Sequence, residues 1–149
     1  MFDRFTERAR AIIAIAHELA AQAGESEPST THLLNAMLSE TRGIAGNVLR
    51  ERAVDAAAIE AATSACVEPD AAFSELATAA TSAAAWLGHH FPGTEHLLLG
   101  LCNLPHSHAY ACLNALDIPP LTCCQDVLEI LGHHDDWDRW QRDHEGHVA

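Results

Sequence analysis

The sequence predicts an all-α fold, on three observations. Hydrophobic residues make up 48% of the chain but aromatic residues only 5%, so alanine supplies much of the apolar content, which favours closely packed helices over a β-sandwich. The two halves of the sequence align with each other, which indicates a repeated structural unit. Signals for helix starts and ends also recur in the same order in both halves. We therefore expect about eight helices in two sets of four.

The repeat is clearest in two motifs, STTHLLNAM at residues 29–37 and GTEHLLLGL at residues 93–101. An offset of 64 residues, the separation of the two motif histidines, aligns Thr30 with Thr94, His32 with His96 and Ala45 with Ala109. The sequence therefore divides into repeat one (1–67), repeat two (68–132) and an acidic tail containing His and Trp (133–149).

The first half opens with a long amphipathic helix. Apolar residues recur at helical spacing after Thr6, and Gly24 is expected to end the helix. Thr30 is the expected N-cap of a short second helix that carries His32. The remaining predicted helices of this half are 43–52 and a fourth, capped by Asp55, that runs to about residue 66.

The second half repeats this order. Thr94 takes the position of Thr30 and is expected to start its helix by accepting a backbone N–H, with Glu95 and His96 in the first turn. We interpret His32 and His96 as hydrogen-bonded histidines near the seam between the repeats. The predicted helices of this half are 70–87, ended by Gly88, then 94–102, 106–116 and a last helix from Pro119 or Pro120 to Leu131.

The composition changes after Gly132 to HHDDWDRWQRDHEGHVA. Trp137 and Trp140 stand three residues apart, so a short helix would lay both on the surface of the domain. A solvated tail is the other interpretation, and the sequence leaves both open.

The charge limits the partners. The net charge is −13, and the eight basic residues are scattered arginines, so the chain is not expected to bind nucleic acid. No apolar run approaches the roughly 20 residues of a membrane span, and the start of the chain lacks the apolar stretch of a signal peptide. We expect a cytoplasmic protein without a membrane partner, and a monomer because of the charge repulsion.

The sequence contains neither the catalytic, metal-binding motif HExxH, despite its eleven histidines, nor the ATP-binding motif GxxxxGK[ST]. We expect no catalytic residue, no metal site and no cofactor. The five cysteines are expected to be small buried side chains. Cys123 and Cys124 lie about 100° apart on a helix, so at most one should face the core squarely, and the other could be a reactive thiol.

Three stretches then carry a resemblance to a known family: MFDRFTERAR at the start, GHHFPGTEHLLLGL at 88–101 and SHAYACLNALDI at 107–118. With their echoes in the first half, they resemble the Clp N-terminal domain (Clp R repeat) at the front of the Clp/Hsp100 unfoldases, particularly the ClpC type. The resemblance covers residues 1 to about 132. It implies two four-helix Clp repeats in a pseudo-twofold arrangement, here as a free-standing copy.

The resemblance implies a non-catalytic module that binds proteins. We interpret the chain as an adaptor or decoy of the Clp proteolysis system, with Clp ATPase or peptidase components, or their substrates and adaptors, as partners. The alternative is sequestration of the cyclic peptide antibiotics that target ClpC-type N-terminal domains, which would confer tolerance. Phe2 and Arg10 are the candidate residues for the groove that such ligands occupy in the family; the other interpretation of Phe2 is a simple anchor for the first helix.

Thr6 and Glu95 are the other candidate ligand-binding residues. In relatives that bind phosphoarginine tags, the glutamate of GTEH resembles a guanidinium acceptor, and the threonine that opens the long helix helps to seat the phosphate. Repeat one keeps Thr6 but has Thr31 in place of the glutamate, whereas repeat two keeps Glu95 but aligns Asp70 with the threonine. Each site is then half complete, and we expect weak or no binding of phosphoarginine.

Overall fold

The computed structural model of the chain describes residues 2–64, 66 and 68–148, with side chains in the last helix described up to residue 144. These residues form helices joined by loops, without a strand, as the sequence predicts. The predicted repeat boundary at residue 67 lies outside the described residues. The helices are α1 (Glu7–Gln22), α2 (Thr30–Met37), α3 (Ile44–Glu51), α4 (Ala56–Thr63), α5 (Phe73–Trp86), α6 (Thr94–Cys102), α7 (His108–Ala115), α8 (Pro120–Ile130), the 3₁₀ turn η1 (His134–Asp136) and α9 (Trp137–Val148).

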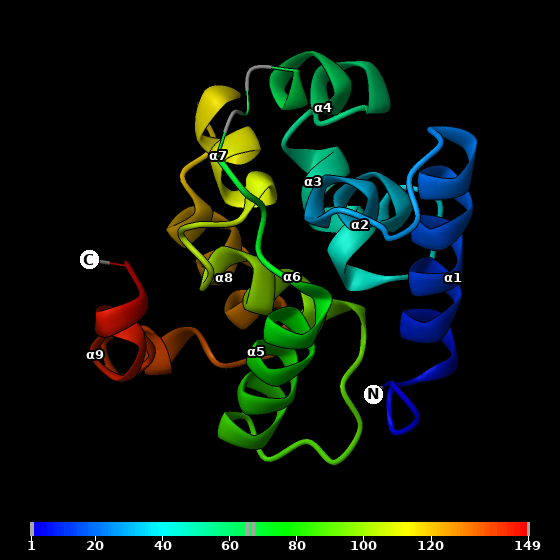
Figure 1. The fold of residues 1–149 in the computed structure, drawn as a ribbon. Helices are drawn as coiled ribbons and strands as arrows, with labels where there is room; N and C mark the ends of the chain where they lie inside the picture. The colour runs from blue at the N-terminus through cyan, green and yellow to red at the C-terminus, as the bar shows by residue number, and fades with distance from the viewer. Residues whose placement is uncertain (1, 65, 67, 149) are drawn as a thin grey trace.

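The first eight helices form two similar sets, α1–α4 and α5–α8. Each long helix packs on the short helix that follows it, α1 on α2 and α5 on α6, while α3 packs on α6 and α2 packs on α7 across the sets. Figure 1 shows α1 along one edge of the molecule, α5 in the lower centre and α9 on the opposite side. The pseudo-twofold arrangement therefore places the shared core where α2, α3, α6 and α8 meet.

Several predicted helix ends are confirmed. The Thr6 hydroxyl accepts the N–H of Ala9 at 3.2 Å, and the Asp55 carboxylate accepts the N–H of Ala58 at 2.8 Å. The helix-ending glycines Gly24 and Gly88 have φ of 78° and 76°, which a side chain would disfavour. Pro120 is the first residue of α8, where its missing N–H leaves no intrahelical bond unmade.

The predicted caps Thr30 and Thr94 were wrong. Ser29 caps α2, since its hydroxyl accepts the N–H of His32, and Gly93 occupies the cap position of α6. Both threonines are the first residues inside their helices and are buried. Because both threonines are buried where the two sets meet, their hydroxyls accept from the other set instead: Thr30 from the N–H of Ala109 in α7, and Thr94 from the N–H of Ala45 in α3.

The predicted difference between Cys123 and Cys124 was also wrong, because neither thiol is exposed. Helix α8 contacts α3, α6 and α7, so more than one of its faces is covered. Hydrogen bonding with the thiols of Cys123 and Cys124, together with burial, raises the pKa of Cys102. Cys66 is the cysteine with partial exposure, and burial raises its pKa as well.

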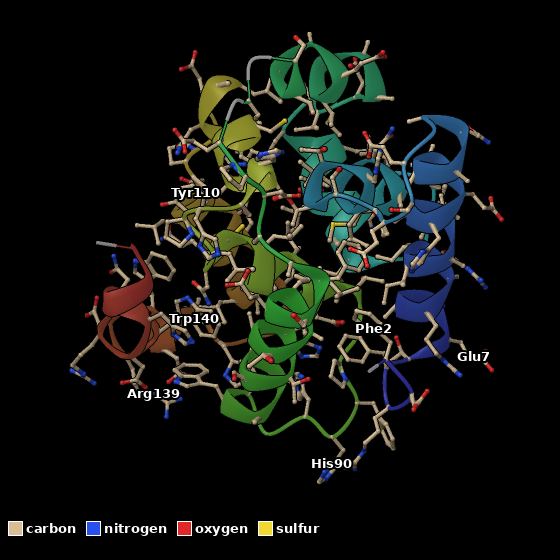
Figure 2. The ribbon with its side chains drawn as sticks, viewed as in Figure 1. Phe2, Glu7, His90, Tyr110, Arg139 and Trp140 are labelled. Carbon is tan, nitrogen blue, oxygen red and sulfur yellow. The ribbon has the colours of Figure 1, made fainter. Side chains whose placement is uncertain are left out.

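The tail forms a docked helix, as the first of the two interpretations predicts. Trp140 on α9 is fully buried in the hydrophobic core, and its ring meets Trp86 of α5 edge to face at 4.9 Å. The guanidinium of Arg139 lies 4.3 Å above the Trp86 ring, and Asp143 accepts the indole N–H of Trp86 at 2.7 Å. Figure 2 shows Trp140 reaching from α9 toward the other helices. Within the described residues, none of the helices is both long and apolar enough to span a bilayer.

Candidate functional site

Thr6 and Glu95, from different repeats, lie beside the same backbone position. The N–H of Thr6 donates to the carbonyl of Pro92 at 2.9 Å, which holds the start of α1 against the loop before α6. A Cβ built on Gly93 would collide with a carboxylate oxygen of Glu95 and would lie 3.6 Å from the Thr6 hydroxyl oxygen. The two candidate ligand-binding residues therefore form one site.

The close approach of the Glu95 carboxylate to the backbone explains why residue 93 is a glycine. Its φ is −108°, which any residue can adopt, so the backbone conformation does not explain the choice. The carboxylate of Glu95 folds back over Gly93 and takes the space that a side chain would fill. Gly93 thus allows Glu95 to reach the start of α1, a role that sequence reasoning missed.

No described residue donates a hydrogen bond to the Glu95 carboxylate. Its side chain is 18% exposed, yet within the described part of the chain it receives no hydrogen bond. Among the described residues, the nearest group that could carry a positive charge is the His96 ring, whose Nδ1 lies 3.6 Å from Oε1 of Glu95. That nitrogen already accepts the N–H of Gly93 at 2.7 Å, so it carries no proton to offer. A largely buried carboxylate without a hydrogen-bond donor is costly, so its burial and lack of a donor make Glu95 the strongest candidate for a group that binds a ligand.

His96 stays neutral. Burial, with a smaller contribution from His89, lowers the pKa of His96 from its ordinary 6.5 to about 4. Because Nδ1 accepts the Gly93 N–H, the ring proton is on Nε2, which donates to Nδ1 of His89 at 2.8 Å. The histidine of the motif therefore fixes the loop of Gly93, and the 3.6 Å approach to Glu95 is not an ion pair. His32 is likewise hydrogen-bonded, since its Nδ1 accepts the Ser29 N–H at 3.1 Å.

The pairing of half-sites predicted within each repeat was wrong. The long helix of one set begins next to the short helix of the other, so Thr6 meets Glu95 and Asp70 meets Thr30. An alignment of the two halves compares residues that are equivalent by sequence, and it does not reveal which of them are neighbours in space. Thr6 and Glu95 therefore lie at one position between the repeats, and Asp70 lies with Thr30 at the other.

At the corresponding position of the other half, both carboxylate oxygens of Asp70 accept hydrogen bonds. Its Oδ2 accepts the N–H of Thr30 at 2.7 Å. Its Oδ1 accepts the Thr30 hydroxyl, the N–H of Ala71 and the N–H of His108, each at 2.8 Å. Helix α5 begins three residues later than predicted, at Phe73. The carboxylate therefore joins the two sets and does not cap the long helix of its own set.

Phe2 borders a groove between the sets. Its ring meets Phe5 at 5.0 Å and Phe73 at 6.1 Å between centroids. Figure 2 shows Phe2 between α1 and α5. The groove has a volume of about 700 Å³ and is lined by Phe2, His17, Pro28, Ser29, Asp70 and Phe73, among others. Phe73, the first residue of α5, was not predicted as a groove residue.

Arg10 does not line this groove. It lies on the exposed side of α1, one turn after Thr6, and its N–H donates to the Thr6 carbonyl at 2.9 Å. Among the residues that the structure describes, no three His, Cys, Asp or Glu side chains are placed to hold a metal ion. The side chain of His147 lies outside that set.

Comparison with known proteins gives consistent matches. Residues 4–75 match the family model of the Clp repeat (R) N-terminal domain. Over 145 residues the chain is 30% identical to the negative regulator of genetic competence ClpC/MecB of Bacillus subtilis, covering 91% of this chain and 18% of that protein. The chaperone protein ClpB of Oceanobacillus iheyensis matches with the same identity and coverage. The chain thus spans less than a fifth of the length of these relatives.

A solved structure shares the fold. The N-terminal domain of the caseinolytic protease associated chaperone ClpD of Arabidopsis thaliana matches with a TM-score of 0.72 at 22% identity, covering 89% of this chain and 97% of that one.

Proposed function

Because the chain belongs to the Clp repeat (R) N-terminal domain family, we propose that it is a cytoplasmic, non-catalytic adaptor or decoy of the Clp proteolysis system. Its partners are Clp ATPase or peptidase components, or the substrates and adaptors of these machines. The domain is a protein-interaction module in the family, which supports a binding role. The observation that carries the proposal is the unpaired Glu95 carboxylate beside Thr6.

The chemistry of this site favours a guanidinium-bearing ligand. A planar guanidinium can donate two parallel hydrogen bonds to the free carboxylate of Glu95. The start of α1, where Thr6 lies, supplies the positive end of a helix for an attached oxyanion. Phosphoarginine combines both groups. Since Thr6 and Glu95 adjoin, we propose that one phosphoarginine site is retained, in place of the weak or absent binding expected from the sequence.

Calorimetric titration with phosphoarginine tests the site. The intact chain should bind one equivalent, and Glu95→Gln should weaken binding at least tenfold, because the neutral amide loses the charge-assisted pair. Glu129→Gln, which alters an exposed glutamate on α8, is the matched control and should bind like the unmodified chain. Binding that is absent, or that is equal in Glu95→Gln, would reject the site.

A pull-down from host lysate with quantitative mass spectrometry separates the two roles. Enrichment of a Clp ATPase or its peptidase by the intact chain, but not by Phe2→Ala/Glu95→Ala, would support an adaptor that acts on the machine. Enrichment of assorted substrates would support a decoy. If neither is enriched over the double variant, the adaptor or decoy proposal fails.

We propose that the working form is a monomer. Light scattering of the purified protein measures its molar mass directly.

The groove at Phe2 favours a second candidate function, sequestration of cyclic peptide antibiotics. Phe2 and Phe73 present aromatic surface to a space of about 700 Å³, which lies in the usual size range of small-molecule sites. Such a ligand should raise the melting temperature of the chain, and Phe2→Ala should abolish the shift. Phe91→Ala, at a side chain that is 59% exposed and outside the groove, should leave the shift unchanged. An equal shift in both variants would exclude groove binding.

A further inference from the structure

The pseudo-twofold arrangement allows each half of the molecule to be compared with the other. Thr30 corresponds to Thr94, and His108 corresponds to Ile44, at the same offset of 64 residues that relates the two motif histidines. Each of these four residues is the first residue of its helix, so its N–H has no partner inside the helix. The two halves differ in what these N–H groups bind.

In one half, the carboxylate of Asp70 binds the two N–H groups. Asp70 accepts the N–H groups of Thr30 and His108 and the Thr30 hydroxyl, at 2.7 to 2.8 Å. Two helix starts and a threonine hydroxyl therefore converge on one oxyanion. Because the carboxylate belongs to the chain, it is present at an effectively saturating local concentration, and its charge would repel a second anion.

In the other half, none of the described residues accepts from the corresponding N–H groups. Within the described residues, the N–H groups of Thr94 and Ile44 meet no hydrogen-bond acceptor. Thr94 is 5% exposed, and its hydroxyl oxygen accepts the N–H of Ala45 at 3.4 Å, but the hydroxyl proton has no acceptor there. The residue that corresponds to Asp70 is Thr6, which caps α1 and carries no charge. This half is open to an oxyanion from outside the chain, beside the unpaired Glu95.

We propose that the Asp70 carboxylate is a built-in occupant of the second site, so that the chain binds a single equivalent of its oxyanion-bearing ligand. This inference rests on the proposed function for the identity of the ligand. The blocking of the second site by Asp70, which we call its closure, does not depend on that identity. Asp70 is the residue that sets the stoichiometry, and the open site uses the N–H groups of Thr94 and Ile44 together with the start of α1 at Thr6.

The unmodified chain provides the first test, by ¹H–¹⁵N NMR titration with phosphoarginine. The amide signals of Thr94 and Ile44 should shift in a saturable way. The amide signals of Thr30 and His108 should not move, because their hydrogen bonds to Asp70 persist. Saturable shifts at Thr30 and His108, or a calorimetric stoichiometry of two, would overturn the closure by Asp70.

Rebuilding the second site provides the decisive test. In a Glu95→Ala background that removes the first site, Ser29→Gly, Thr31→Glu and Asp70→Thr together copy Gly93, Glu95 and Thr6. The rebuilt variant should bind one equivalent of phosphoarginine. The matched control carries Glu95→Ala, Ser29→Gly and Thr31→Glu but keeps Asp70, and it should bind none. Circular dichroism and urea unfolding establish that both variants are folded.

The outcomes separate this inference from the proposed function. If the unmodified chain binds one equivalent but the folded, rebuilt variant binds none, the role of Asp70 is refuted while the proposed site stands. If the unmodified chain binds none but the rebuilt variant binds one, the proposed site fails and the closure by Asp70 is upheld. If the control that keeps Asp70 binds as well as the rebuilt variant, Asp70 does not close the site.

Discussion

The hydroxyl of Thr30 accepts a hydrogen bond from the backbone N–H of Ala109, 79 residues away in the chain, at 3.0 Å. The corresponding bond in the other half runs from the N–H of Ala45 to the hydroxyl of Thr94 at 3.4 Å. Each short helix therefore uses its first threonine to hold the start of a helix in the other set. This pair of bonds explains why the motif needs a threonine that does not cap its own helix.

Replacing these threonines with valine tests whether Thr30 contributes more than Thr94 to the free energy of unfolding. Thr30→Val removes the bond from Ala109 and the hydroxyl bond to Asp70, and should lower the free energy of unfolding by about 3 kcal/mol. Thr94→Val removes only the longer bond and should lower it by about 1 kcal/mol. Urea unfolding at neutral pH measures both. Equal losses in the two variants would show that the link to Asp70 adds nothing.

The buried His96 predicts a dependence of stability on pH. Its pKa is lowered to about 4 in the folded chain from 6.5, so the unfolded chain takes up a proton first as the pH falls. The contribution of His96 to stability is therefore complete above about pH 6.5 and is lost toward pH 4. Between pH 7.5 and 5 the free energy of unfolding should fall by about 2 kcal/mol.

His96→Asn is the control for this prediction. An asparagine in the first turn of α6 can still accept the N–H of Gly93 but does not titrate. The variant should be less stable at pH 7.5, since it loses the packed ring, and its stability should change less between pH 7.5 and 5. An unchanged pH dependence in the variant would assign the effect to other groups.

Trp140 should anchor α9. Its side chain is fully buried, so Trp140→Ala leaves a large cavity beside Trp86 and should cost about 4 kcal/mol of unfolding free energy. Trp137→Ala, at a half-buried position on the same helix, should cost much less. Chemical denaturation gives both values, and the emission of Trp86 should shift to the red only in Trp140→Ala. Similar costs for the two variants would mean that α9 is not held by Trp140.

Gly93→Ala should affect binding more than folding. The added Cβ meets mainly the end of the Glu95 side chain, which can rotate away, so the loss of stability should be about 1 kcal/mol or less. The displaced carboxylate can no longer lie beside Thr6, and affinity for phosphoarginine should fall at least tenfold. Calorimetry and thermal unfolding on the same sample measure the two effects. Unchanged affinity would show that Glu95 binds from another position.

Much of the fold followed from the sequence because its signals are local. The capping side chains of Thr6 and Asp55 and the glycines at 24 and 88 act within one helical turn, and all four were predicted correctly. Pro120, which begins α8, was one of the two prolines predicted to open the last helix. The repeat also led to the family, which the comparisons confirm. Local signals and a repeated pattern are what a single sequence displays most directly.

The candidate site was predicted less well because it depends on contacts between the halves. Thr6 and Glu95 were both named as candidate residues but were assigned to separate sites, because an internal alignment carries no information on which helix ends lie side by side. The role of Asp70 was missed for the same reason: its partners Thr30 and His108 are 40 and 38 residues away. The burial of both Cys123 and Cys124 also depends on three neighbouring helices.

The reciprocal bonds of Thr30 and Thr94 have the geometry of an isologous contact, the kind found in a symmetric homodimer, where residue i of one copy meets residue j of the other and the reverse. Here the two copies are covalently joined, so the dimer cannot dissociate on dilution. A polypeptide with α1–α4 alone would expose the face that α6 and α7 now cover, and would bury it by pairing with a second copy of itself. Tethering also frees the two halves to diverge, and the difference between Thr6 and Asp70 is a divergence that an exchangeable homodimer could not hold.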